Sequence, residues 1–139
     1  MPAVAQCGAQ LPLSAQDVDG LWLAVRKARA WGDDLVTIRC VSETEIRRLN
    51  KMYRGRDAST NVLTFSYERE HDVALCIEVA LGEATQRAVD GRSYCALLII
   101  HALLHATGMD HENSSADNRD MQTIQAEILS KLGFTVAKL

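Results

Sequence analysis

Three of the chain's four histidines fall within eleven residues, at His101, His105 and His111. His101 and His105 are four residues apart, which on an α-helix places both side chains on one face, with Cβ atoms about 5–6 Å apart. Two ring nitrogens at that spacing can bind one tetrahedral zinc ion. Gly108 can end the helix and turn the chain so that His111 supplies a third nitrogen. We therefore expect one Zn²⁺ ion per chain, bound by these three histidines.

The alternative is that the histidine pair is an ordinary pair of core side chains. The helix expected here is apolar on nearly every side, so both imidazoles would be buried, and buried polar groups need partners. A metal supplies one partner to each ring. Ligation by nitrogen alone favours zinc, with nickel or copper as the alternatives. Asp110, beside His111, can accept a ring N–H hydrogen bond and so orient that ligand.

The number of ligands bears on function. Three protein ligands leave a fourth position for water, as in catalytic zinc sites, whereas Cys76 or His71 could complete a closed structural site. Water on zinc can have its pKa lowered to about 7, which supplies a hydroxide nucleophile at neutral pH. Metalloproteases of the HExxH type carry a glutamate general base after the first histidine, and that position is Ala102 here. The sequence therefore disfavours that peptidase mechanism.

A basic segment between positions 47 and 56 contains no acidic residue and consists of Arg47, Arg48, Lys51, Arg54 and Arg56. In a chain of net charge −3 it is the one concentrated positive region. A solvated helix face is the ordinary explanation. The alternative is a surface that binds the phosphates of a nucleic acid. Arg54, next to Gly55, is placed to reach inward, and its planar guanidinium suits a phosphate.

Length and composition limit the class of protein. The 139 residues, 47% apolar and 24% charged, suit one domain over 1–139 and exclude intrinsic disorder. No window reaches the roughly 20 apolar residues of a membrane span, and the first residues do not resemble a secretory signal. We therefore expect a cytoplasmic protein that binds neither membrane nor DNA. Its cysteines are then expected to be reduced and mostly buried, at Cys7, Cys40, Cys76 and Cys95.

The hydrophobic periodicity predicts the elements that must position these residues. Helices are predicted over 14–31, 42–52, 82–90, 93–107 and 115–132, and strands over 35–41, 61–67 and 73–79, with an edge strand in the first dozen residues. Ser14 is the expected N-cap of the first helix, and Ser42 with Glu45 forms a capping box for the second. The short connection after Tyr67 predicts an antiparallel hairpin. Early strands and late helices indicate an α+β fold, a small mixed sheet packed against helices.

Two blocks of this sequence resemble a known family. The segment 101–111 (HALLHATGMDH) resembles the HGxLHLxGYDH signature of the YbeY family, bacterial endoribonucleases of ribosomal RNA maturation. The segment 49–65 matches at LN, YRG and TNVLTF, and Met121 with Glu127 is a weaker match. The order and spacing agree over residues 35–134.

The resemblance implies an α+β fold with a metalloprotease-like histidine helix. It implies a zinc-dependent, single-strand-specific endoribonuclease of ribosomal RNA maturation and ribosome quality control. The three motif histidines of the family bind the metal, which corresponds to His101, His105 and His111, and the YRG arginine acts in the cleft, which corresponds to Arg54. Single-stranded ribosomal RNA and ribosomal subunit proteins are the implied partners.

The chain departs from the family pattern at some positions. Ala102, Ala106 and Met109 replace usual motif residues, and His71-Asp72 stands where Gly-Asp usually opens the strand. The short connection before His71 indicates a different loop over the cleft. The missing general base supports a rival function, a zinc-stabilised RNA-binding or ribosome-assembly factor without catalysis, and a hydrolase of a small substrate is a third. For an endoribonuclease, the nucleophile is either water or the ribose 2′-OH.

Overall fold

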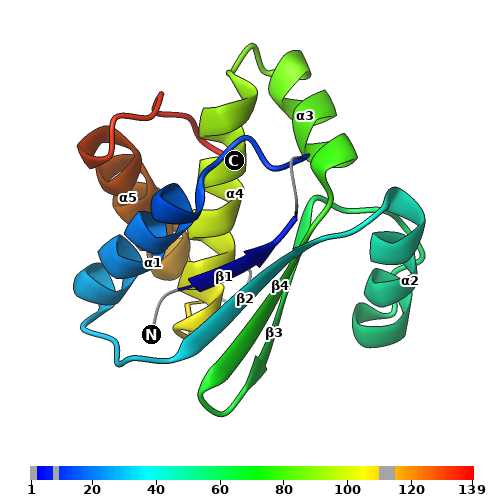
Figure 1. The fold of residues 1–139 in the computed structure, drawn as a ribbon, viewed down its shortest axis with the longest axis horizontal. Helices are drawn as coiled ribbons and strands as arrows, with labels where there is room; N and C mark the ends of the chain where they lie inside the picture. The colour runs from blue at the N-terminus through cyan, green and yellow to red at the C-terminus, as the bar shows by residue number, and fades with distance from the viewer. Residues whose placement is uncertain (1–2, 8–9, 110–114) are drawn as a thin grey trace.

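The computed structural model describes residues 3–7, 10–109 and 115–139 (Figure 1). In these residues four strands form one sheet and five helices pack around it. The strands are β1 (Ala3–Gln6), β2 (Leu35–Cys40), β3 (Val62–Tyr67) and β4 (Glu70–Leu75). The helices are α1 (Ala15–Arg29), α2 (Glu43–Arg54), α3 (Ile77–Gln86), α4 (Gly91–Ala106) and α5 (Ser115–Lys131). The predicted α+β class is confirmed.

The sheet has the strand order β1-β2-β4-β3 and is mixed. Strand β2 runs parallel to β1 and β4, and β3 runs antiparallel to β4. Tyr67 pairs with Glu70, so the hairpin turns through the two residues between them, and the predicted hairpin is confirmed. Because β3 stands last in the strand order, one of its edges faces away from the other strands.

The sheet separates two clusters of apolar side chains. Figure 1 shows α1, α4 and α5 on one face of the sheet and α2 on the other. Side chains alternate along a strand, so Val73 and Leu75 of β4 join the main cluster with α4, whereas Ala74 joins a second cluster with Ile46 and Leu63. Helix α4 thereby lies in the centre of the main core.

Helix α4 is buried on nearly every side. Between Ser93 and Ala106, every residue is buried except His101 and His105, which are half-buried. Asp90 begins this helix by accepting a hydrogen bond from the Ser93 N–H at 2.9 Å. No helix in the described residues is both long and apolar enough to cross a lipid bilayer.

The two predicted N-caps are present, but only one capping box is complete. Ser14 Oγ accepts from the Asp17 N–H, and the Asp17 carboxylate accepts from the Ser14 N–H, at 3.0 and 2.9 Å. Ser42 Oγ accepts from the Glu45 N–H at 3.1 Å. The Glu45 carboxylate instead pairs with Arg48 at 2.6 Å, so the predicted second half of that box does not form.

The predicted strand over 73–79 is wrong at both ends, because β4 already begins at Glu70 and stops at Leu75, and α3 begins at Ile77. The apolar, β-branched residues there are typical of a strand. However, Ile77, Ala80 and Ala84 are the buried residues of α3, and their spacing of three and four positions is that of one helix face. Short apolar runs fit either structure, and the tertiary packing decided for the helix.

The prediction that all four cysteines are free is also wrong. Cys7 and Cys40 form a disulfide, whereas Cys76 and Cys95 are free and buried. The parallel register of β1 and β2 pairs Gln6 with Arg39. The residues that follow this pair are Cys7 and Cys40, and their Cα atoms lie 4.7 Å apart. The sequence separation of 33 residues concealed this proximity.

Reduction of the Cys7–Cys40 disulfide should lower the free energy of unfolding. A loss of about 4 kcal/mol is expected, because the bond restricts the unfolded chain over a separation of 33 residues. Thiol titration of unreduced, unfolded protein should detect only the thiols of Cys76 and Cys95. The Cys7→Ser variant should show the same loss of stability and no further response to reductant. Detection of all four thiols without reduction would contradict the pairing.

Candidate functional site

A cleft of about 960 Å³ runs along β3. Residues 60–67 form one wall, and the end of α2 contributes Tyr53 and Arg54. Helix α4 contributes His101 and His105, and α5 contributes Gln125 among others. Side chains from the histidine cluster and from the basic segment therefore meet in one cavity.

The histidine pair lies on one face of α4, as the spacing predicts. The Nε2 atoms of His101 and His105 are 3.1 Å apart, and the ring centroids are 4.7 Å apart with the rings at 80°. His111, the third expected ligand, and Asp110, expected beside it, lie outside the described residues. The structure therefore places two of the three predicted ligands side by side at the cleft wall.

Gln125 of α5 fixes the orientation of His101. Its Oε1 atom accepts a hydrogen bond from His101 Nδ1 at 2.8 Å, and the Gln125 side chain is buried. Because Oε1 only accepts, Nδ1 carries the hydrogen, and Nε2 is the nitrogen directed toward His105. A carbonyl oxygen on the far nitrogen is the usual support of a metal-binding histidine. No local pattern in the sequence links Gln125 to His101, so this residue was not predicted.

The two histidines fit a zinc ion. Nitrogens bound about 2.0–2.1 Å from a tetrahedral zinc lie roughly 3.3 Å apart, and the observed separation of the two Nε2 atoms is 3.1 Å. The separation of the two nitrogens, in the conformation that Gln125 supports, is therefore compatible with two zinc ligands. The Cys76 thiol, an alternative fourth ligand, is buried in the cluster beneath α2, and burial raises its pKa. His71, the other alternative, is hydrogen-bonded through both ring nitrogens to Ser66 and Asp34.

Two contacts hold the histidine helix in place. Thr64 of β3 donates a hydrogen bond from Oγ1 to the carbonyl oxygen of Ala102 at 3.2 Å. Arg29 at the end of α1 donates to both the hydroxyl and the carbonyl oxygen of Thr107, at 3.0 and 3.2 Å. Beyond Thr107, Gly108 has a φ of 93°, a conformation that favours glycine, and it ends the helix as the sequence predicts.

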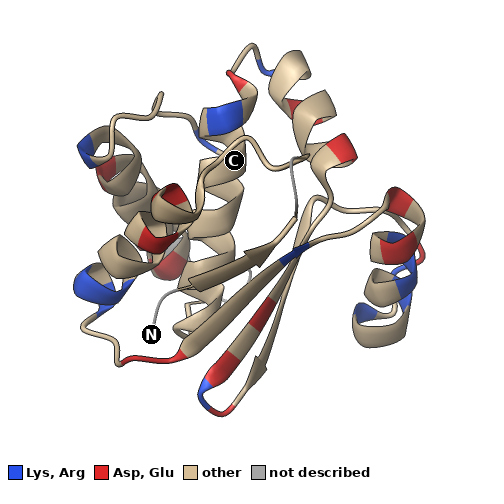
Figure 2. Cartoon of the chain, in the orientation of Figure 1, with Lys and Arg blue, Asp and Glu red and all other residues tan. Residues whose placement is uncertain are grey.

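The predicted basic patch is divided in the structure. Arg47 pairs with Asp57 at 2.8 Å, and Arg48 pairs with Glu45, so these two charges are offset by carboxylates. Figure 2 shows acidic and basic residues together on α2. Arg54 and Arg56 line the cleft, together with Arg87, which the sequence analysis did not single out. Arg54 is the last residue of α2 rather than part of a loop, and Gly55, with a φ of 69°, ends the helix.

Aromatic side chains lie beside these arginines. The rings of Tyr53 and Phe65 pack against each other with centroids 4.9 Å apart and an interplanar angle of 59°. Tyr53 is 58% exposed and Tyr67 is 55% exposed, and all three side chains line the cleft. The cleft therefore combines guanidinium groups with exposed aromatic faces.

These features define an α+β protein whose buried central helix presents a histidine pair to a basic, aromatic cleft. The chain belongs to the YbeY family, since the family model described as endoribonuclease YbeY matches residues 19–133.

Individual relatives agree with this assignment. The endoribonuclease YbeY of Ralstonia nicotianae is 40% identical over 143 residues, covering 89% of this chain and 76% of the relative. That of Aromatoleum aromaticum is 40% identical over 107 residues, covering 74% and 69%. The solution structure of TM1509 from Thermotoga maritima has a TM-score of 0.63 and 23% identity, covering 93% of this chain and 90% of that one. It shows the same fold.

Replacement of Gln125 by alanine should destabilise the protein by about 1–3 kcal/mol, because His101 Nδ1 loses its acceptor in a partly buried position. Urea unfolding measures the difference. Glu127→Ala, an exposed position on the same helix, is the matched control and should change stability little. Equal unfolding curves for Gln125→Ala and the control would show that the hydrogen bond contributes nothing.

Proposed function

We propose that this chain is an endoribonuclease that cleaves single-stranded RNA in the cleft along β3, and that its natural substrate is ribosomal RNA. Its family and the names of its relatives support the endoribonuclease activity. The observation that carries the proposal is the meeting of the His101 and His105 pair with Arg54 in one cleft.

The lining of the cleft suits a single strand. The guanidinium groups of Arg54 and Arg56 can bind backbone phosphates, and the exposed faces of Tyr53 and Tyr67 can stack on bases. The bases of a duplex are already stacked on one another and do not offer their faces to aromatic side chains. Selection of single-stranded RNA follows from this difference.

The residues divide the chemistry between them. His101 and His105, with His111, would hold a zinc ion, which when bound supplies a Lewis acid for a phosphoryl oxygen and lowers the pKa of water. Gln125 keeps Nε2 of His101 directed toward that position. Arg54 stabilises the negative charge that develops on the phosphoryl oxygens as the phosphodiester is attacked. Its guanidinium already lines the cleft before the reaction begins.

The proposed substrate implies the protein's surroundings. Ribosomal RNA and ribosomal subunit proteins are the expected partners, in the cytoplasm. A disulfide is uncommon in that compartment. Neither Cys7 nor Cys40 lines the cleft, so the disulfide takes no direct part in the proposed chemistry.

A cleavage assay tests the proposed activity. The purified protein should cut single-stranded RNA, leave duplex RNA and DNA intact, and stop when a chelator removes the metal. The His101→Ala protein, purified identically, is the control for trace ribonuclease contamination. Equal cleavage by both proteins would contradict the proposal, and an RNA that is bound but left intact would support the binding factor instead.

Within that assay, Arg54→Ala should reduce cleavage by about 100-fold or more while leaving zinc content and fold unchanged, because the developing charge loses its donor. Arg54→Lys should recover the activity only in part, since a point charge cannot reproduce a bidentate contact. Arg48→Ala is the matched control on the same helix, because Arg48 pairs with Glu45 and does not line the cleft. Unchanged turnover in Arg54→Ala would reduce this residue to a solvated surface charge.

The zinc proposal predicts about one equivalent of tightly bound metal per chain. His105→Ala should lose most of that metal and should unfold at a lower temperature, because metal binding contributes to folding. Metal analysis and thermal unfolding measure the two effects. A chelator should lower the unfolding temperature of the wild type but not of the variant. Full zinc occupancy in His105→Ala would contradict the assignment of this ligand.

A further inference from the structure

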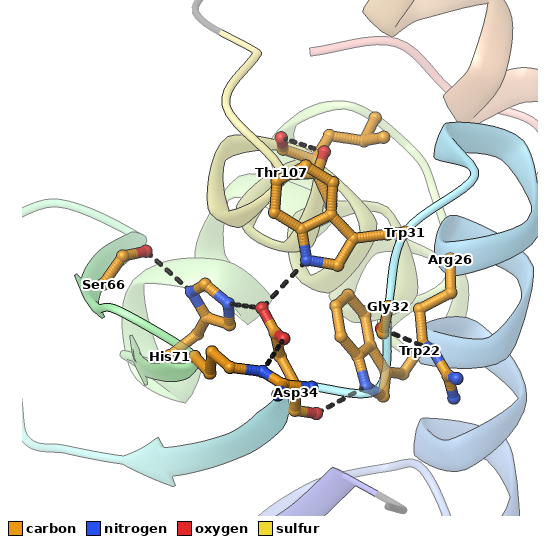
Figure 3. A network of polar contacts seen from close by, with 10 residues as sticks. Trp22, Arg26, Trp31, Gly32, Asp34, Ser66, His71 and Thr107 are labelled. Atoms are coloured by element: carbon orange, nitrogen blue, oxygen red, sulfur yellow. Dashed lines mark hydrogen bonds and ion pairs between the residues drawn. The ribbon is translucent and has the colours of Figure 1, made fainter.

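Ser66, His71 and Asp34 form a row of hydrogen-bonded side chains (Figure 3). Asp34 and His71 are buried, and Ser66 lines the cleft. His71 Nδ1 lies 2.8 Å from Ser66 Oγ, and His71 Nε2 lies 2.7 Å from Asp34 Oδ2. His71 is only 2% exposed and Asp34 only 6% exposed. A hydroxyl on a histidine that is itself oriented by a carboxylate is the arrangement that activates nucleophilic serines.

The hydrogens between Ser66, His71 and Asp34 can be assigned by starting from the buried carboxyl of Asp34. Burial raises the pKa of the Asp34 carboxyl, but the hydrogen bonds from His71 and Trp31 outweigh this effect. The pKa of Asp34 is therefore lower than its ordinary value, and the carboxyl is ionised. A carboxylate only accepts, so the hydrogen between it and His71 belongs to Nε2. In the neutral imidazole Nδ1 is then bare, and it accepts the hydrogen of the Ser66 hydroxyl.

Asp34, the buried end of this hydrogen-bonded row, has several further contacts. Trp31 donates from Nε1 to Asp34 Oδ2 at 2.9 Å, and Arg69 approaches Oδ1 at 3.5 Å. Trp22 donates from Nε1 to the Asp34 backbone carbonyl at 3.3 Å, and its ring meets the His71 ring at 6.4 Å between centroids. The imidazole therefore has a fixed orientation toward Ser66.

The Ser66 end of this hydrogen-bonded row is open to the cleft. Ser66 is exposed and lines the same cleft as His101 and His105. Side chains two residues apart on a strand lie on the same face of the sheet. Thr64 donates a hydrogen bond to the carbonyl oxygen of Ala102 in α4, so Ser66, two residues further along β3, also faces α4. The cleft thus contains a candidate proton acceptor, although the helix itself has alanine where an HExxH helix carries its glutamate.

We propose that Ser66 is the general base of this cleft, acting as the exposed end of a proton relay through His71 to Asp34. The proposal rests on the endoribonuclease function proposed above. As the attacking hydroxyl oxygen forms its bond to phosphorus, its proton passes to Ser66 Oγ while the Ser66 proton passes to His71 Nδ1. The bond from phosphorus to the leaving oxygen breaks, and the relay returns its proton to that oxygen. Asp34 stabilises the imidazolium that exists between the two transfers.

The competing explanation is that the three groups only satisfy each other's hydrogen bonds. Ser66→Ala separates the two explanations, because it leaves the His71 to Asp34 bond intact and changes an exposed side chain. A relay predicts that kcat for RNA cleavage falls by about 100-fold or more in Ser66→Ala, with KM changed less than about twofold. Ser66→Thr, which keeps a hydroxyl, should recover most of the activity. Ser59→Ala, an exposed serine outside the cleft, is the matched control.

A second measurement needs no RNA. A small fluorophosphonate should label Ser66 in the wild type, since Ser66 Oγ forms a bond to phosphorus, the P–F bond breaks, and the Ser66 proton moves to His71 Nδ1. Peptide mass spectrometry locates the label. His71→Gln, which keeps a polar side chain but no basic nitrogen, should not be labelled. Zinc content and thermal unfolding of each variant show whether it is folded.

The outcomes are distinct. Labelling of Ser66 that depends on His71, together with the loss of kcat in Ser66→Ala, supports the relay. Unchanged kcat in Ser66→Ala, or no label on wild-type Ser66, overturns the relay and leaves the endoribonuclease function standing. A wild-type protein that leaves single-stranded RNA intact overturns the proposed function and, with it, the role of Ser66 as a base.

Discussion

Burial of α4 in the centre of the main core is the constraint on which the site depends. The helix is surrounded by the sheet and by α1, α3 and α5, and an imidazole in such a place needs a hydrogen bond or a ligand on each nitrogen. Gln125 satisfies one nitrogen of His101, the Nε2 atoms of the two histidines face each other, and both residues line the cleft. The same packing that stabilises the fold therefore orients the pair.

The edge position of β3 is what gives this helix a cleft. A central strand would have neighbours on both sides, whereas the outer edge of β3 lets residues 60–67 form a wall. Alternation along the strand then sends Ser66 toward the histidine layer and Phe65 toward Tyr53 of α2. One edge strand thus brings polar and aromatic side chains to the same cavity from opposite faces of the sheet.

Charge in the cleft is set by pairing rather than by the number of basic residues. The run from Arg47 to Arg56 looks uniform in sequence, yet two of its guanidinium groups lie against carboxylates. Opposite charges within about 4 Å weaken the field that each projects toward a distant phosphate. The field of the cleft therefore comes from the arginines that line it, one of which, Arg87, lies far along the chain from the others.

The sequence alone determined the α+β class, the hairpin, the helix with His101 and His105 on one face, and the N-cap at Ser14, because each depends on residues within a few positions of one another. It did not reveal the Cys7–Cys40 bond, the Gln125 support or the chain from Ser66 to Asp34. Those contacts join residues brought together by strand register and helix packing, and no local pattern encodes them. Tertiary structure also decided that residues from Ile77 are helical, since burial of one helix face outweighed their preference for a strand.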